Sequence, residues 1–285
     1  MAYESPFEQD HYLEEERWDK NAEWLKEEGF VEAGYDMMST DGWVEGGQLI
    51  NEHGYITKYN WSWKKDWKEM GDQLKEKGIK LGIYYDPLWV TAAAYNSDAV
   101  IEGTDGIKVS SLVDTDNGHF SNFKAQDVPQ SAEFAGKEWC KKGEPALYWL
   151  DTDKPGAEEY VKGYVKHFAE AGAVFLRVDF LGWYENGIAG DGKQNDKPAY
   201  GTKRYKKALK WMSEACQEYG VMLSLVMPNQ YNHAENELEY GDMMRVNEDV
   251  ANGGWDNSTR GPEKGWTNPS SFNHSAFLSH RSSSR

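Results

Sequence analysis

The sequence contains few cysteines and no long hydrophobic run. Its two cysteines, Cys140 and Cys216, are too few for a disulfide framework and lie too far apart for a CxxC redox or zinc site. No segment reaches the roughly 18 consecutive apolar residues that a membrane-spanning helix requires. We therefore expect two free, buried thiols and a protein with no membrane partner.

Positive charge is also scarce. The chain carries 31 Lys and Arg against 48 Asp and Glu, which gives a net charge of −17 at pH 7. A surface this acidic repels phosphate groups, so nucleic acids are poor partners. The first residues, MAYESPFEQDHY, lack the basic segment and apolar stretch of a secretory signal, and this predicts a cytoplasmic location.

Motifs that bind cofactors or metals are missing as well. No GxGxxG or P-loop sequence follows a candidate strand, and neither GxSxG nor HExxH occurs. The segment DTDNGHF, which starts at Asp114, begins like a calcium loop, but Ala125 stands where such a loop requires Glu. We expect no cofactor and no metal site.

Short apolar runs alternate with amphipathic helices along the chain, which predicts βα units and a parallel sheet. One helical stripe contains Trp63, Trp67, Met70 and Leu74, and two more cover residues 160–168 and 205–216. Five apolar runs are candidate strands: residues 33–38, 79–86, 173–180, 221–227 and 242–246. A glycine stands between helix and strand at four places: Gly29, Gly78, Gly172 and Gly220.

The length of 285 residues fits two average domains or one α/β barrel. Five strands do not close an eight-stranded barrel, so the chain is either an open sheet or part of a barrel. Residues 89–145 are rich in Asp, Gly, Ser and Asn, and we expect an inserted loop or lid there within one domain over 1–285. The sequence ALYWLDTDKP predicts a further extended segment, with Asp151 or Asp153 capping the next helix.

Charged residues follow four of the candidate strands. In parallel α/β folds the functional residues gather at the carboxyl ends of the strands. Four such ends with carboxylates therefore predict one site. The residues are Asp41 with Trp43, then Asp86, then Arg177 with Asp179, and finally Arg245 with Glu248 and Asp249.

The segments STDGW, LGIYYD, LRVDF and RVNED occur here in the order found in glycoside hydrolase families 27 and 36. From about Gly29 to Trp255 the chain resembles these α-galactosidase-type enzymes of clan D. The resemblance implies a TIM (β/α)8-type barrel that is incomplete here, without the first strand and the last two. It also implies a retaining exo-glycosidase, a hydrolase of carbohydrate metabolism that cleaves terminal α-linked galactose or a related sugar from an oligosaccharide or glycoside.

The resemblance also implies a role for each site residue. Asp179 corresponds to the nucleophile, which forms a glycosyl-aspartate intermediate, and Asp249 corresponds to the acid/base. Two departures from the family pattern, Thr40 in place of an Asp and Arg177 in place of a Lys, leave the galactose preference open. The implied substrate-binding residues are Asp41, Trp43, Asp86, Arg177 and Arg245.

The residues themselves support two different carboxyl roles. Arg177 lies two positions before Asp179, so both point to the same side of a strand, and a cation there should keep the pKa of Asp179 low. The like charge of Glu248 should raise the proton affinity of Asp249. A retaining mechanism places the two catalytic carboxyls roughly 5 to 5.5 Å apart.

Alternatives remain open at each position. Arg177 and Asp179 could form a structural ion pair, and Glu248 could replace Asp249 as the acid/base. Asp41 and Asp86 could serve only as turn residues. The chain could be a catalytically silent carbohydrate-binding barrel, or it could use the same mechanism on α-glucosides or β-L-arabinopyranosides.

Overall fold

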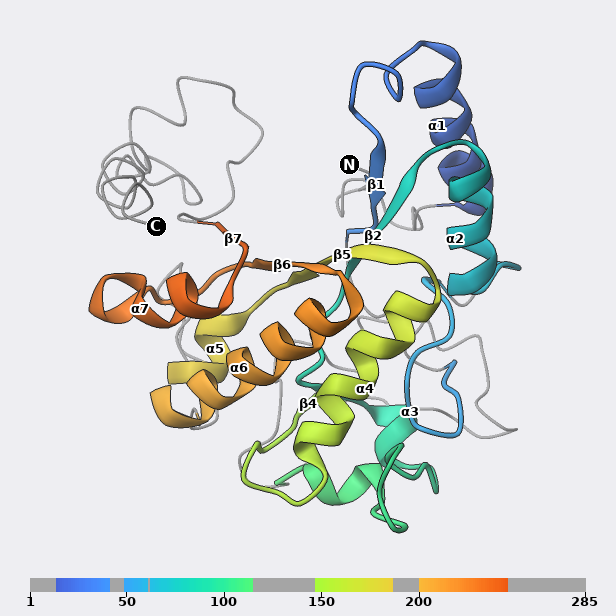
Figure 1. Ribbon diagram of the computed structural model, residues 1–285. Coiled ribbons are helices and arrows are strands. Elements are labelled where there is room, and N and C mark those ends of the chain that lie inside the picture. Colours follow the sequence, from blue (N-terminus) through green and yellow to red (C-terminus); the bar gives the residue numbers. More distant parts are fainter. Residues whose placement is uncertain (1–13, 42–48, 61, 115–146, 187–199, 246–285) are drawn as a thin grey trace, which may run out of the picture.

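The computed structural model describes residues 14–41, 49–60, 62–114, 147–186 and 200–245. A parallel sheet of five strands forms its centre, and each strand pairs with the next one in the order β1-β2-β5-β6-β7 (Figure 1). Four of the five predicted strands lie within their apolar runs and are shorter than them, whereas the first begins four residues later than predicted, because residues 31–34 form a turn, and ends one residue beyond its run. Their bounds are β1 (Met37–Ser39), β2 (Lys80–Tyr84), β5 (Ala173–Val178), β6 (Met222–Leu225) and β7 (Met243–Met244).

Helices pack against one face of this sheet. Contacts join α2 to β2, α4 to β5 and α6 to β6, so each of these helices covers its own strand (Figure 1). This is the arrangement of a (β/α) barrel, of which the described strands form an incomplete part. The helices are α1 (Glu15–Glu27), α2 (Trp67–Glu76), α4 (Ala157–Glu170), α5 (Leu181–Asn186), α6 (Thr202–Tyr219) and α7 (Tyr231–Tyr240).

The helix α2 begins later than the apolar stripe predicts. Asp66 forms a capping box with Glu69, in which each side chain accepts a hydrogen bond from the backbone N–H of the other. This box fixes Trp67 as the first helical residue. Trp63 therefore precedes the helix, where the prediction had placed it inside, but its side chain is still buried in the core.

The glycines between helix and strand have the predicted role. Gly29, Gly78, Gly172 and Gly220 all adopt positive φ angles, between 70° and 95°. This left-handed conformation ends a helix at little cost only for glycine. It allows the chain to turn from each helix into the next strand.

Two further strands form a second sheet. Its strands β3 (Trp89–Thr91) and β4 (Leu147–Trp149) are antiparallel, and β4 confirms the extended segment predicted in ALYWLDTDKP. The short helix α3 (Ala92–Tyr95) and the 3-10 helix η1 (Val109–Leu112) follow β3. Residues 89–114 are thus folded and partly buried, whereas the rest of the predicted insertion, 115–145, lies outside the described residues.

The predicted cap of α4 is wrong. The N-cap residue is Gly156, with φ at 86°, and no side chain caps this helix. Asp151 instead accepts a hydrogen bond from the backbone N–H of Asp153 and pairs with Arg204 of α6. The carboxylate of Asp153 pairs with Arg204 and with Lys207 of the same helix. Both carboxylates therefore fasten the loop before α4 to α6.

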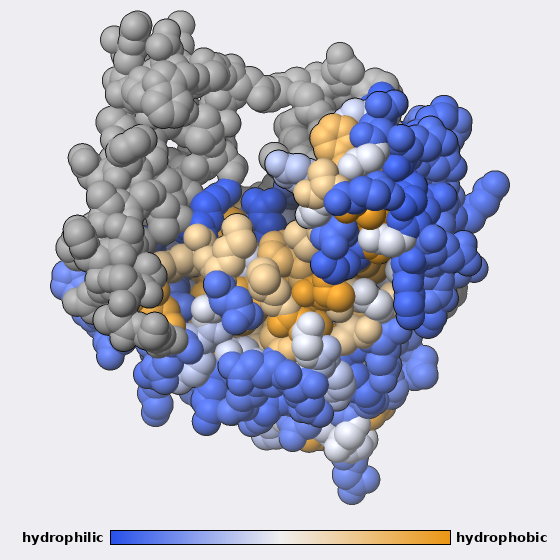
Figure 2. All heavy atoms as spheres, turned by 45° about the horizontal axis from the view of Figure 1, so that its top comes forward, coloured by the Kyte–Doolittle hydropathy of each residue, from blue (hydrophilic) through white to orange (hydrophobic). Residues whose placement is uncertain are grey.

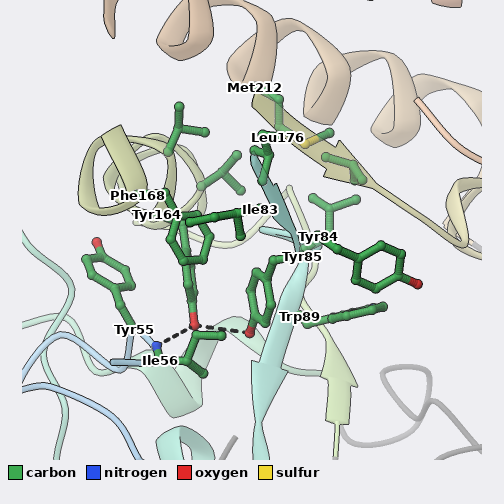
Figure 3. Packing of buried hydrophobic residues seen from close by; sticks show 14 of the residues in the cluster. Tyr55, Ile56, Ile83, Tyr84, Tyr85, Trp89, Tyr164, Phe168, Leu176 and Met212 are labelled. Atoms are coloured by element: carbon green, nitrogen blue, oxygen red, sulfur yellow. Dashed lines mark hydrogen bonds between the residues drawn. The ribbon is translucent and has the colours of Figure 1, made fainter. Parts of the chain in front are cut away.

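Aromatic side chains fill much of the space between sheet and helices. The hydroxyl of Tyr164 accepts a hydrogen bond from the backbone N–H of Ile56 at 2.9 Å and lies 3.0 Å from the hydroxyl of Tyr85 (Figure 3). Cys216 of α6 is a free, buried thiol as predicted, and burial raises its pKa to about 12. Cys140 lies outside the described residues.

The opposite face of the sheet carries exposed apolar side chains at the start of three strands. Met37, Met222 and Met243 are 42%, 49% and 54% exposed. Figure 2 shows hydrophobic surface in the middle of its view, bordered by hydrophilic surface. Within the ranges that the structure describes, we find no helix long and apolar enough to cross a membrane.

Candidate active site

The register of the sheet brings the predicted site residues to one edge. Tyr84 of β2 pairs with Arg177 of β5, which pairs with Ser224 of β6. Asp179 follows β5 directly after Val178, and Arg245 follows β7. The carboxyl ends of neighbouring parallel strands therefore present these side chains together, as the sequence predicts. Trp43, Asp249 and its alternative Glu248 lie outside the described residues, so their positions stay predictions.

Asp179 is buried, at 7% exposure, and both of its oxygens are held. Oδ1 accepts a hydrogen bond of 2.7 Å from the backbone N–H of Phe180, and Oδ2 accepts one of 3.0 Å from the hydroxyl of Tyr84. Phe180 has φ at 60°, a conformation that costs free energy in a residue with a side chain and that is concentrated at functional sites. The turn after β5 thus fixes the orientation of this carboxylate.

The pKa of Asp179 departs from its ordinary value in the direction opposite to the one we predicted. Burial raises it, and this effect outweighs the cations Arg245 and Arg177 and the two hydrogen bonds, all of which lower it. The prediction considered only Arg177 because the sequence does not reveal how deeply a strand end is buried. Asp179 therefore releases its proton at a higher pH than an exposed aspartate does.

Arg177 forms its ion pair with Asp41, not with Asp179. Its Nη1 lies 3.0 Å from Oδ2 of Asp41, and its guanidinium lies 5.6 Å from the centre of the Tyr84 ring. Arg177 therefore reaches across β2 to the end of β1, and the alternative of an Arg177–Asp179 ion pair is wrong. Asp41 is also held through its carbonyl oxygen, which accepts a hydrogen bond of 2.7 Å from the hydroxyl of Tyr59.

Asp86 is fully buried at the end of β2. Its Oδ1 accepts a hydrogen bond of 2.8 Å from the backbone N–H of Leu88, while Oδ2 has no hydrogen-bond partner among the residues that the structure places. Burial raises the pKa of Asp86 well above its ordinary value, the Leu88 N–H lowers it and the charge of Asp179 raises it. Asp86 thus has the turn role that was one of the alternatives. Its side chain exposes no surface through which it could contact a sugar directly.

Thr40, the residue that departs from the family pattern, directly follows β1 and is hydrogen-bonded to β2. Its backbone N–H donates to the carbonyl of Gly82 at 3.1 Å, and its Oγ1 accepts a hydrogen bond of 3.0 Å from the N–H of Tyr84. The side chain is 1% exposed. Thr40 therefore serves to join β1 to β2 and offers no hydroxyl to a ligand.

Tyr84 is a site residue that the sequence analysis missed. A signal was available, because Tyr84 stands two positions before Asp86 and so points to the same face of its strand. Figure 3 shows Tyr84 and Tyr85 on opposite sides of β2, with Tyr85 facing the buried tyrosine cluster. Among the described residues, no group of three or more His, Cys, Asp or Glu side chains could hold a metal ion.

No protein-family model matches the chain, but individual proteins and solved structures are similar to it. An isomalto-dextranase from Arthrobacter globiformis is 39% identical over 245 residues, which are 86% of this chain and 35% of that protein. The structure of the isomalto-dextranase of Arthrobacter globiformis T6 with panose has a TM-score of 0.75 at 38% identity, over 90% of this chain and 41% of the other.

A more distant structure shares the fold alone. The β-L-arabinopyranosidase of glycoside hydrolase family 27 from Geobacillus stearothermophilus has a TM-score of 0.55 at 19% identity, over 81% of this chain and 49% of the other. The chain spans about a third of the length of the curated relative that it matches. The chain thus resembles an isomalto-dextranase in sequence over part of that protein's length, and it shares the fold of an incomplete (β/α)8 barrel with a family 27 glycoside hydrolase.

Proposed function

We propose that the full-length protein is a retaining glycosidase that hydrolyses α-linked sugars through a glycosyl-aspartate intermediate. The observation that carries this proposal is the setting of Asp179, whose two oxygens are oriented by Phe180 and Tyr84 at a strand end with Arg177 and Arg245 close by. The 39% identity with an isomalto-dextranase supports the same function.

In this mechanism Asp179 attacks the anomeric carbon. It must be ionised to do so, and the hydrogen bonds from Tyr84 and Phe180 stabilise that charged form against the effect of burial. Asp249 protonates the leaving oxygen and then activates water, and a retaining mechanism requires the two catalytic carboxyls to lie roughly 5 to 5.5 Å apart. Glu248 is the alternative acid/base.

The substrate we favour is dextran or another α-linked glucan, and the identity with isomalto-dextranase supports this choice. Thr40 supports it as well, because the Asp that holds sugar hydroxyls in the family pattern is replaced here by a buried residue hydrogen-bonded to β2. Hydrolysis of terminal α-linked galactose, which the sequence resemblance implies, is the second candidate. Arg177, Arg245 and Asp41 would hold sugar hydroxyls in either case, and Trp43 would stack on the ring.

A substrate panel tests this proposal. Full-length protein is incubated with dextran and with aryl α-glucoside, α-galactoside and β-L-arabinopyranoside, and the released sugar is measured. We expect turnover of dextran and loss of at least about a thousandfold in Asp179→Asn. The control is Asp153→Asn, which removes a carboxylate paired with Lys207 and Arg204 outside the site and should keep full activity.

Two outcomes oppose the proposal in different ways. Saccharide binding in calorimetry without release of any sugar would favour a silent carbohydrate-binding barrel. Turnover of the α-galactoside alone would keep the mechanism and replace the glucan by galactose.

A further inference from the structure

Two buried carboxyl groups stand at adjoining strand ends. Asp86 follows β2 and Asp179 follows β5, and these two strands pair directly along their length. Their side chains are 0% and 7% exposed. The charge of Asp179 raises the pKa of Asp86, so ionisation of one group disfavours ionisation of the other.

The two groups have unequal sets of partners. Asp179 accepts two hydrogen bonds, one on each oxygen, and the cations Arg245 and Arg177 stabilise its charge. Asp86 accepts one, from Leu88 N–H, and its other oxygen has no hydrogen-bond partner in the described part of the chain. Burying a carboxylate ion is costly unless it is paired and fully hydrogen-bonded. The negative charge therefore belongs on Asp179.

The other titratable groups around Asp86 do not change this balance. Tyr85 precedes it directly in the chain, and Tyr205 of α6 also experiences its charge. Burial raises the pKa of both hydroxyls well above the ordinary value, so both are neutral. Within the described ranges, no Lys or Arg lowers the pKa of Asp86. Among the residues that the structure places, the charge that acts on its pKa is that of Asp179.

We propose that Asp86 and Asp179 share a single negative charge, with Asp179 ionised and Asp86 holding its proton at neutral pH. This inference rests on the proposed function in one respect: it makes Asp86 a positioning residue for the nucleophile instead of a ligand for sugar hydroxyls. A neutral Asp86 at the neighbouring strand end does not repel the charge on Asp179 that the reaction needs. An ionised Asp86 would push the pKa of Asp179 upward and remove its reactive form.

Infrared spectroscopy of the full-length protein tests the proposal without any need for turnover. A protonated carboxylic acid has a C=O stretching band that a carboxylate lacks. We expect such a band at pH 7, its loss in Asp86→Asn, and its persistence in Asp179→Asn. The control is Glu237→Gln, because Glu237 is a second buried carboxyl with a raised pKa, and the Asp86 band must survive its removal.

Asp86→Asn keeps an oxygen to accept the hydrogen bond of Leu88, which favours folding of the variant. If Asp86→Asn fails to fold, Asp179→Asn still tests the proposal, because the carboxylic acid band of Asp86 must remain in that variant. A band unchanged in Asp86→Asn or lost in Asp179→Asn would overturn the proposal. Absence of sugar release from every substrate would refute the proposed function and leave the infrared result intact.

The pH profile gives a second readout. If Asp86 is neutral, the acid limb of kcat/KM in Asp86→Asn stays within about half a pH unit of its original position. If Asp86 is ionised, removing its charge lowers the pKa of Asp179, and the acid limb moves down by about one unit or more. That shift would contradict the shared charge.

Discussion

The hydroxyl of Tyr84 donates a hydrogen bond of 3.0 Å to Oδ2 of Asp179, and both residues are buried at the carboxyl edge of the sheet. Because the bond favours the ionised carboxylate, it opposes the effect of burial on the pKa of Asp179. Tyr84 thereby links the end of β2 to the group that we propose as the nucleophile.

Tyr84→Phe removes this hydrogen bond and keeps the ring beside Arg177. We expect the pKa of Asp179 to rise, so the acid limb of the kcat/KM profile moves to higher pH and kcat/KM at neutral pH falls by about tenfold. Tyr219→Phe, at an exposed position on α6, is the matched control and should leave the profile in place. A Tyr84→Phe profile that coincides with the original would mean that the hydroxyl does not act on the nucleophile.

The ion pair between Arg177 and Asp41 should couple β1 to β5 energetically. Its two side chains are partly buried and span β2. In a double-mutant cycle of Arg177→Gln and Asp41→Asn, followed by chemical denaturation, we expect a coupling of about 1 kcal/mol or more in the free energy of unfolding. Strictly additive effects would show that the pair contributes nothing to holding the strands together.

The raised pKa of Asp86 predicts a pH dependence of stability. Above pH 3.8, its ordinary value, the unfolded chain releases this proton while the folded chain keeps it. The folded state then binds more protons, so stability falls as pH rises, by up to about 1.4 kcal/mol per pH unit until the folded group also ionises. We expect Asp86→Asn to lose less unfolding free energy than the parent between pH 5 and pH 8, and an equal loss in both would argue against a protonated Asp86.

The pattern of apolar residues and glycines in the sequence predicted the strands and the helix ends well. The five strands and the glycines at Gly29, Gly78, Gly172 and Gly220 follow from apolar runs and from the φ angles that only glycine adopts easily. The error at Trp63 was avoidable, because Asp66 and Glu69 already form a capping-box pattern in the sequence. Helical spacing alone does not say where a helix begins.

The site was harder to predict because it depends on contacts between strands. That Arg177 pairs with Asp41 follows from the order and register of β1, β2 and β5, and neighbouring positions in the sequence suggested Asp179 instead. The direction of the Asp179 pKa depends on burial, which is a property of the assembled sheet. Residue type and spacing identified the carboxylates, and tertiary structure decided their partners and charges.

The most direct test of the mechanism is to trap the covalent intermediate. A fluorinated glycosyl fluoride with an activated leaving group forms the glycosyl-enzyme quickly and releases it slowly, so digestion and mass spectrometry locate the attached sugar. We predict a single labelled peptide that carries the sugar on Asp179, and no label in Asp179→Asn. A label on another carboxylate, or none on a protein that turns over the substrate, would contradict the assignment of Asp179 as the nucleophile.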